Sequence, residues 1–381
     1  MTRKEDLELF NLQTVDNPYN SYFLLDNPFP GRGEKPGEVC TNQQEIKRVF
    51  ANILQSFDTK SKRLRINGES GAGKTNILQY FDRLTEDARS AGRIGNIKPI
   101  YVIASVEDYI ILHGQIVDEL LKKTFTDLVN LLKDNRDKLI YWKNELQQAN
   151  EVIDALFSIF EGTLFSWGYE RSEDVFQRWL KGQKISTTDK KLIRIERDIG
   201  NPSLAIKYLQ DYLQLLTHFN ICDGIVLFID EFEEVFESLP KAKQSRFAQD
   251  LRHLIDALEP TCFFVFATTP EPTDLMRYPA LERRMGDAHL LIPIRDIEEA
   301  TKYAVDYLKA GRELFMEIHN ETKLSENELN ELLPLDENDI LNAFENAIKV
   351  TKRRLNSSET LPGDFLPELR RIIKEKVEGQ S

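Results

Sequence analysis

The chain has 381 residues, which is enough for two domains of ordinary size or for one large domain with a smaller one. Its hydrophobic content of 41% and charged content of 30% are typical of a soluble protein, and no apolar run approaches the ~18 residues of a membrane span. The net charge of -13 argues against a basic nucleic-acid coat protein. The polar N-terminus does not resemble a signal peptide, and the three cysteines lack metal-ligand spacing, so we expect a cytoplasmic location.

The N-terminal segment, residues 1–40, is irregular and rich in proline, glycine and asparagine. Several aromatic residues lie within it, so we expect an ordered arm that packs on the main domain. A helix is predicted next over residues 41–57, with Thr41 as its N-cap.

The most informative motif is GESGAGKT at residues 68–75, which fits the G-x-x-x-x-G-K-[ST] pattern of a phosphate-binding loop. A short predicted strand (63–67) precedes it and a helical pattern (76–84) follows, as that loop requires. A glycine-rich turn could match by chance, but this setting favours nucleotide binding. Lys74 would reach the β- and γ-phosphates, and the Thr75 hydroxyl would bind Mg²⁺. The predicted nucleotide-binding residues are Gly68, Glu69, Ser70, Gly71, Ala72, Gly73, Lys74 and Thr75.

The remaining pattern predicts an α/β fold with a parallel sheet flanked by helices. Further strands are expected at residues 98–105, 224–230, 261–270 and 288–294, with a helix at 241–258. Residues 106–221 are almost entirely helical in pattern and form a large insertion. The expected domains are the arm (1–40), a P-loop ATPase domain (41–294) and a small C-terminal helical domain (295–381), broken at LPLDEND and SETLPGD.

Asp230 and Glu231 end the apolar run GIVLFID, which is the Walker B pattern. A carboxylate at a strand end can hold Mg²⁺ through its water shell, so Asp230 is the predicted metal residue together with Thr75. Glu231 is the predicted general base for the attacking water. The alternative is a polar pair that caps the exit of the strand, and the phosphate loop upstream favours the catalytic interpretation.

Thr268 and Thr269 end the next strand, where a polar residue could orient the lytic water. A turn before Pro270 explains them equally well. Arg283 and Arg284 precede the last strand, and one of them could stabilise charge at a neighbouring subunit's γ-phosphate. On spacing alone, a surface helix with ordinary arginines is the favoured interpretation.

Together these motifs resemble the AAA+ ATPases. The NPF element (27–29) and the WLKGQKIS segment (179–186) make the chain most similar to the origin-recognition and Cdc6-like branch and to related bacterial ATPases of defence and transposition. The resemblance implies ATP and Mg²⁺ as cofactors, catalytic roles for Lys74 and Glu231, and a helical lid. It also implies that Thr268 or Thr269 is sensor 1 and that Arg283 or Arg284 is the arginine finger. Two departures stand out. Sensor 1 is threonine rather than asparagine, and Gly363 occupies the expected place of the sensor-2 arginine, which Arg370 or Arg371 could replace.

The leading functional hypothesis is a Mg²⁺-dependent ATPase that forms homo-oligomers and loads or remodels DNA or a DNA-bound partner, in phage defence or mobile-element biology. The alternative is a regulatory ATP switch that recruits a partner protein without acting on DNA; the acidic charge and the long insertion favour a protein partner. Three local basic strips could serve DNA binding or simply be solvated surface. They are KSKRLR (60–65), KRR (352–354) and RRIIKEK (370–376).

Overall fold

The structure is a computed structural model, and it describes residues 17–31, 37–57, 62–104, 107–146, 151–161, 168–269, 278–319, 323–357 and 359–379. The chain divides into two compact units. One contains the described parts of Met1–Gln44, Gly68–Tyr80 and Leu290–Ser381, and the other contains those of Glu45–Asn67 and Phe81–His289. The domain boundaries expected near residues 40 and 294 remain predictions.

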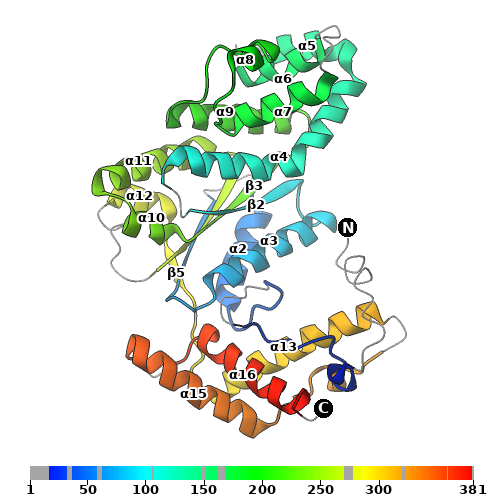
Figure 1. Ribbon diagram of the computed structural model, residues 1–381, viewed down its shortest axis with the longest axis vertical. Helices are drawn as coiled ribbons and strands as arrows, with labels where there is room; N and C mark the ends of the chain where they lie inside the picture. The colour runs from blue at the N-terminus through cyan, green and yellow to red at the C-terminus, as the bar shows by residue number, and fades with distance from the viewer. Residues whose placement is uncertain are drawn as a thin grey trace. The chain divides into compact units, whose positions relative to one another are not determined.

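A five-stranded sheet in the order β2-β3-β4-β1-β5 confirms the predicted α/β fold (Figure 1). Its strands are β1 Arg63–Asn67, β2 Ile97–Ile103, β3 Gly224–Asp230, β4 Cys262–Thr268 and β5 Ala288–Leu290. The pairs β1–β4, β3–β4 and β2–β3 are all parallel. Every residue of β3 and β4 is buried, as expected for strands covered on both faces.

The fifth strand was predicted over residues 288–294, but it ends at Leu290. Pro293 has no N–H to donate to a strand ladder. Ile294 instead forms an isolated antiparallel bridge with Thr360, which ties the chain after the sheet to the C-terminal helices.

Two helices, α2 Gln44–Gln55 and α3 Lys74–Ser90, pack near the centre of the sheet. Phe50 of α2 stacks on Phe81 of α3 with ring centroids 4.0 Å apart, and it also stacks on Phe263 of β4. The predicted N-cap of α2 was wrong. The helix begins at Gln44, and the Thr41 hydroxyl donates instead to the Asp306 carboxylate at 2.7 Å.

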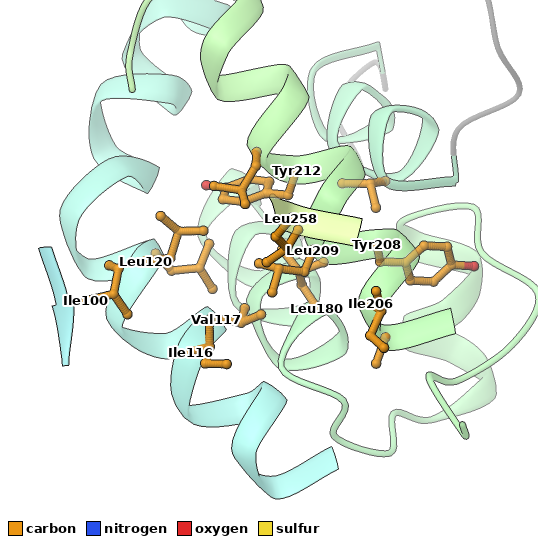
Figure 2. Packing of buried hydrophobic residues seen from close by; sticks show 14 of the residues in the cluster. Ile100, Ile116, Val117, Leu120, Leu180, Ile206, Tyr208, Leu209, Tyr212 and Leu258 are labelled. Carbon is orange, nitrogen blue, oxygen red and sulfur yellow. The ribbon is translucent and has the colours of Figure 1, made fainter. Parts of the chain in front are cut away.

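Helices dominate the long insertion, as predicted for its described residues (Figure 1). They are α4 Tyr109–Asp134, α5 Leu139–Glu145, α6 Glu151–Glu161, α7 Gly168–Leu180, α8 Thr187–Leu192 and α9 Pro202–His218. The apolar faces of these helices and of β2–β4 form one continuous core. Figure 2 shows part of this core, with Ile100 from β2, Leu120 from α4 and Leu209 from α9.

Three further helices belong to this unit: α10 Phe232–Ser238, α11 Lys241–Leu258 and α12 Pro279–Met285. Helix α11 has the predicted bounds, 241–258. Helix α10 was not predicted. Cys222 and Cys262 are buried free thiols, and burial raises the pKa of Cys222 to about 11.

The C-terminal helices α13 Ile297–Ile318, α14 Glu326–Leu329, α15 Glu337–Leu355 and α16 Pro362–Val377 form a separate core with the N-terminal arm. The predicted breaks are present. Asp336 caps α15 in a capping box with Asp339, and α15 ends at a left-handed Asn356. Within the arm, Phe29 packs against Tyr307 and Asn27 donates to the Arg370 carbonyl. Residues 1–16 and 32–36 of the predicted arm lie outside the described residues.

Among the residues that the structure describes, no helix is both long and apolar enough to cross a membrane.

We predict that Leu209→Ala lowers the free energy of unfolding by about 2–5 kcal/mol, because it leaves a cavity in a fully buried site. The exposed Gln214 on the same helix provides the control, and Gln214→Ala should change stability by less than ~0.5 kcal/mol. Denaturant unfolding of both variants is the measurement. Equal stability of the two variants would contradict a packed insertion.

Candidate nucleotide-binding site

The phosphate loop has the backbone conformation that its glycines predict. Gly71 and Gly73 have φ values of 88° and 93°, in the left-handed region that side chains disfavour. The Ala72 N–H donates to the Glu69 carbonyl at 2.9 Å, and α3 begins directly at Lys74. Such a turn directs successive N–H groups toward one point, and the positive end of the helix dipole adds to them.

Lys74 lies across this loop, where its amine donates to the Gly68 carbonyl at 2.8 Å. The first turn of α3 also contacts the N-terminal arm: the Asn76 amide donates to the Val39 carbonyl at 2.8 Å and accepts from the Gly37 N–H at 3.0 Å. Asn76 was not singled out from sequence, because its partners lie almost forty positions earlier in the chain.

The start of α16 lies against the phosphate loop. The Gly363 N–H donates to the Gly71 carbonyl at 2.9 Å, and a Cβ atom at Gly363 would come within 2.9 Å of that same oxygen. A side chain at position 363 therefore does not fit, which explains why no arginine occupies the expected sensor-2 position.

The two proposed substitutes for that arginine are engaged elsewhere. Arg370 donates to the Phe29 carbonyl at 3.0 Å, and Arg371 pairs with Glu368 and Glu375 on its own helix. The arginine that does approach the loop is Arg354, at the end of α15. A Cβ atom on Gly71 would lie 3.3 Å from its Nη2 atom.

Asp230 ends β3 and is almost fully buried. Its Oδ1 accepts from the Glu231 N–H at 2.9 Å, and its Oδ2 accepts from the Tyr101 hydroxyl at 2.6 Å. A carboxylate offers about four lone-pair sites, so these two bonds orient Asp230 without exhausting it. Its oxygens therefore fit the demands of Mg²⁺ or of a metal-bound water.

Tyr101 is a site residue that the sequence did not reveal, since it sits within an apolar run. Burial, and then the negative charge of Asp230, raise the pKa of Tyr101 well above its ordinary value. The hydroxyl therefore stays protonated and donates to Asp230 at neutral pH.

Glu231 has a left-handed backbone conformation, with φ 54° and ψ 33°, at the start of α10. A non-glycine residue there costs about 1–3 kcal/mol, and such strain is concentrated at functional sites. Glu234 is exposed, while the side chain of Glu233 lies outside the described residues.

Thr268 is buried at the end of β4, opposite Asn67 at the end of β1. Its hydroxyl and the Asn67 side chain are hydrogen-bonded at 2.7 Å, and the Arg65 Nε donates to the same hydroxyl at 3.3 Å. Thr269 follows the strand and is half-buried. The structure thus links Thr268 to Asn67, the residue that precedes the phosphate loop.

The parallel sheet brings Asn67, Thr268 and Asp230 to its carboxyl edge. The register pairs Asn67 with Thr268, and β3, which ends in Asp230, lies next to β4. The sequence predicted Asp230 and Thr268 as site residues but not Asn67. A polar side chain at the end of a predicted strand was the signal that could have indicated Asn67.

The two candidate finger residues differ in their surroundings on α12. Arg284 pairs with Asp256 of α11 at 2.9 Å, an interaction that raises the arginine's pKa. Arg283 is exposed, and its Nε donates to the Pro279 carbonyl one turn earlier in the same helix. Arg283 is therefore the more available of the two for another molecule.

A parallel sheet with a phosphate loop after β1 and an acidic pair after β3 defines a P-loop NTPase fold. The chain belongs to the family of BREX system ATP-binding proteins BrxC/D, whose model matches residues 107–300, just over half of the chain. This match confirms the resemblance to ATPases of bacterial defence systems. It includes Asp230 and Glu231 and begins after the phosphate loop.

Two solved structures of the Aeropyrum pernix ORC2 protein are also similar to the chain. The ADPNP–ADP complexes match at 15% identity and a TM-score of 0.40, covering 92% of this chain and 71% of that one. The ADP form matches at 14% identity and a TM-score of 0.42, covering 92% and 72%. None of the curated proteins compared matches the chain.

We predict that Tyr101→Phe raises the Mg²⁺ concentration needed for half-maximal ATP turnover by about threefold to tenfold, because Asp230 loses the donor that orients it. Nucleotide affinity without Mg²⁺ should not change. Tyr141→Phe, at an exposed tyrosine of α5, is the matched control. An unchanged Mg²⁺ requirement in Tyr101→Phe would show that this hydrogen bond has no part in metal binding.

Proposed function

We propose that the chain is a Mg²⁺-dependent ATP hydrolase of phage defence. The observation that carries this proposal is the phosphate loop, in which Gly71 and Gly73 adopt the left-handed conformation and α3 begins at Lys74. Membership of an ATP-binding BREX family supports ATP as the nucleotide.

In the proposed site, the loop N–H groups and Lys74 bind the phosphates. The Thr75 hydroxyl and the Asp230 carboxylate hold Mg²⁺, which neutralises charge on the phosphates when bound. Glu231 accepts the proton of the attacking water, and Thr268 or Thr269 orients that water. The strained backbone of Glu231 supports this role, because the structure keeps an unfavourable conformation at that position.

We further propose that the active form is a homo-oligomer in which Arg283, or else Arg284, reaches the γ-phosphate of a neighbouring copy. The exposure of Arg283 and the ion pair of Arg284 favour Arg283. A cytoplasmic location is part of the same proposal, and a reducing compartment suits a chain in which Cys40, Cys222 and Cys262 are cysteine thiols.

We expect Glu231→Gln to reduce ATP turnover by at least about a hundredfold, because the amide cannot accept the proton of the water. ATP binding should persist, since the loop is unchanged. Glu234→Gln, at an exposed glutamate of α10 three residues after Glu231, should retain turnover. Steady-state phosphate release and equilibrium binding measure the two properties, and undiminished turnover in Glu231→Gln would refute the assignment of the base.

Action on DNA is the second part of the proposal, and the basic strips bear on it. Arg63 and Arg65 of the first strip pair with Glu259 and Glu282, and Arg371 of the third pairs within its helix. Lys352 and Arg353 of the second strip, in the last turn of α15, are exposed and are a candidate contact for DNA.

The alternative is an ATP switch that recruits a protein partner. The exposed apolar side chains of Ile140 and Tyr141 on α5 favour it, because they present apolar surface on the insertion.

Duplex DNA separates these alternatives. If DNA is the substrate, it should increase ATP turnover at low salt, and the increase should fall as salt rises, because phosphate contacts release counterions. Polyglutamate of equal charge is the control for a nonspecific polyanion effect. Turnover that is indifferent to DNA, with no DNA binding at low salt, would leave the switch as the better account.

A further inference from the structure

Asn67 connects the start of the phosphate loop to the threonine pair that ends β4. It is the last residue of β1, its register partner on β4 is Thr268, and the loop begins at the next residue, Gly68. Asn67 and Thr268 are both buried, with 7% and 2% of their surfaces exposed. A buried amide has to find its hydrogen-bond partners inside the protein, so the contacts of Asn67 help to set the geometry of this edge.

The partners of the Asn67 amide determine which of its ends is the nitrogen. One end faces only acceptors, which are the Thr268 hydroxyl at 2.7 Å, the Thr269 carbonyl at 2.9 Å and the Thr268 carbonyl at 3.0 Å. The other end faces only donors. An amide nitrogen donates and does not accept, so Nδ2 lies at the first end. The Asn67 side chain therefore donates to both residues of the strand end.

The Thr268 hydroxyl consequently accepts on two sides. Asn67 Nδ2 donates to it, and so does Arg65 Nε at 3.3 Å. A hydroxyl has two lone pairs and one proton, so both lone pairs are occupied and the proton remains to be donated. Among the residues that the structure describes, none accepts this proton in that arrangement. The hydroxyl is thereby held as a donor, and an oxygen of a bound molecule would complete its hydrogen bonds.

We propose that Asn67 is a positioning residue for ATP hydrolysis and that it acts through Thr268. It ties the residue before the phosphate loop to the end of β4, and it sets the direction in which the Thr268 hydroxyl donates. The inference rests on the proposed function, in which Thr268 or Thr269 orients the attacking water. It selects Thr268, because that hydroxyl is held from two sides.

A donor at this position suits the chemistry of the water. A water that accepts from Thr268 keeps one lone pair, which forms the new bond to the γ-phosphorus as the bond to the bridging oxygen breaks and ADP leaves. It also keeps both protons, and one of them passes to Glu231. A threonine that accepted from the water would compete with Glu231 for a proton instead.

Asn67→Asp, in the full chain, reverses the key hydrogen bond without removing it. The carboxylate has the shape of the amide but accepts, so the Thr268 proton turns toward it and is lost to the water. We expect kcat for ATP to fall about tenfold or more, and the KM for ATP to stay within about threefold because the loop residues are unchanged. A link that is merely structural would keep most of its kcat. Wild-type kcat, or a loss confined to KM, overturns the proposal.

Asn96→Asp is the matched control. The Asn96 side chain also donates to a backbone carbonyl, that of Ile221, but it precedes β2 and so lies at the amino end of a strand. The same exchange of nitrogen for oxygen at this position should change kcat by less than about twofold. A loss of kcat equal to that in Asn67→Asp would show that the effect is not particular to Asn67, and the proposal would fail.

Thr268→Val keeps the size of threonine and removes the hydroxyl through which Asn67 is proposed to act. Its kcat should fall by a similar factor, and adding Asn67→Asp should slow it by no more than about twofold further. Losses that multiply in the double variant overturn the route through Thr268. If the wild-type chain hydrolyses no ATP, the proposed function fails; if it does and Asn67→Asp keeps the wild-type kcat, only the positioning role fails.

Discussion

The parallel pairing of β1, β4 and β3 is the constraint on which the rest of the site depends. Parallel strands run in one direction, so their carboxyl ends meet at one edge of the sheet. The register places Asn67, Thr268 and Asp230 at that edge. The Tyr101 hydroxyl donates to Asp230, and a hydrogen bond joins the Thr268 hydroxyl to the Asn67 side chain, so the polar side chains that end these strands are oriented. The phosphate loop continues directly from Asn67.

A second constraint acts inside the other unit, where backbone meets backbone at Gly71 and Gly363. A side chain at position 363 would clash with the Gly71 backbone, so only glycine allows this approach. Position 363 therefore cannot carry a phosphate-binding arginine while its N–H is hydrogen-bonded to the loop. Arg354 reaches the same loop from the preceding helix. Among the described residues, the arginine beside the loop is therefore Arg354 of α15 rather than a residue at position 363.

The sequence predicted the sheet and the loop well because both depend on local signals. The apolar runs of β3 and β4 and the glycines of the loop need no knowledge of distant contacts. Thr41 failed as an N-cap because Asp306, far along the chain, takes its hydroxyl. Tyr101 and Arg354 were missed for the same reason: their partners are set by tertiary structure, and a tyrosine in a strand or an arginine in a basic run has no distinctive pattern.

The central claim is that one nucleotide site uses the loop at Thr75 and the acidic strand end at Asp230. An experimental structure with Mg²⁺ and a non-hydrolysable ATP analogue tests it most directly. The account predicts the β- and γ-phosphates in the loop, the Thr75 hydroxyl on Mg²⁺, and Asp230 bound to the metal or to one of its waters. A nucleotide bound away from the loop, or a Mg²⁺ ion that neither Thr75 nor Asp230 approaches, would contradict it.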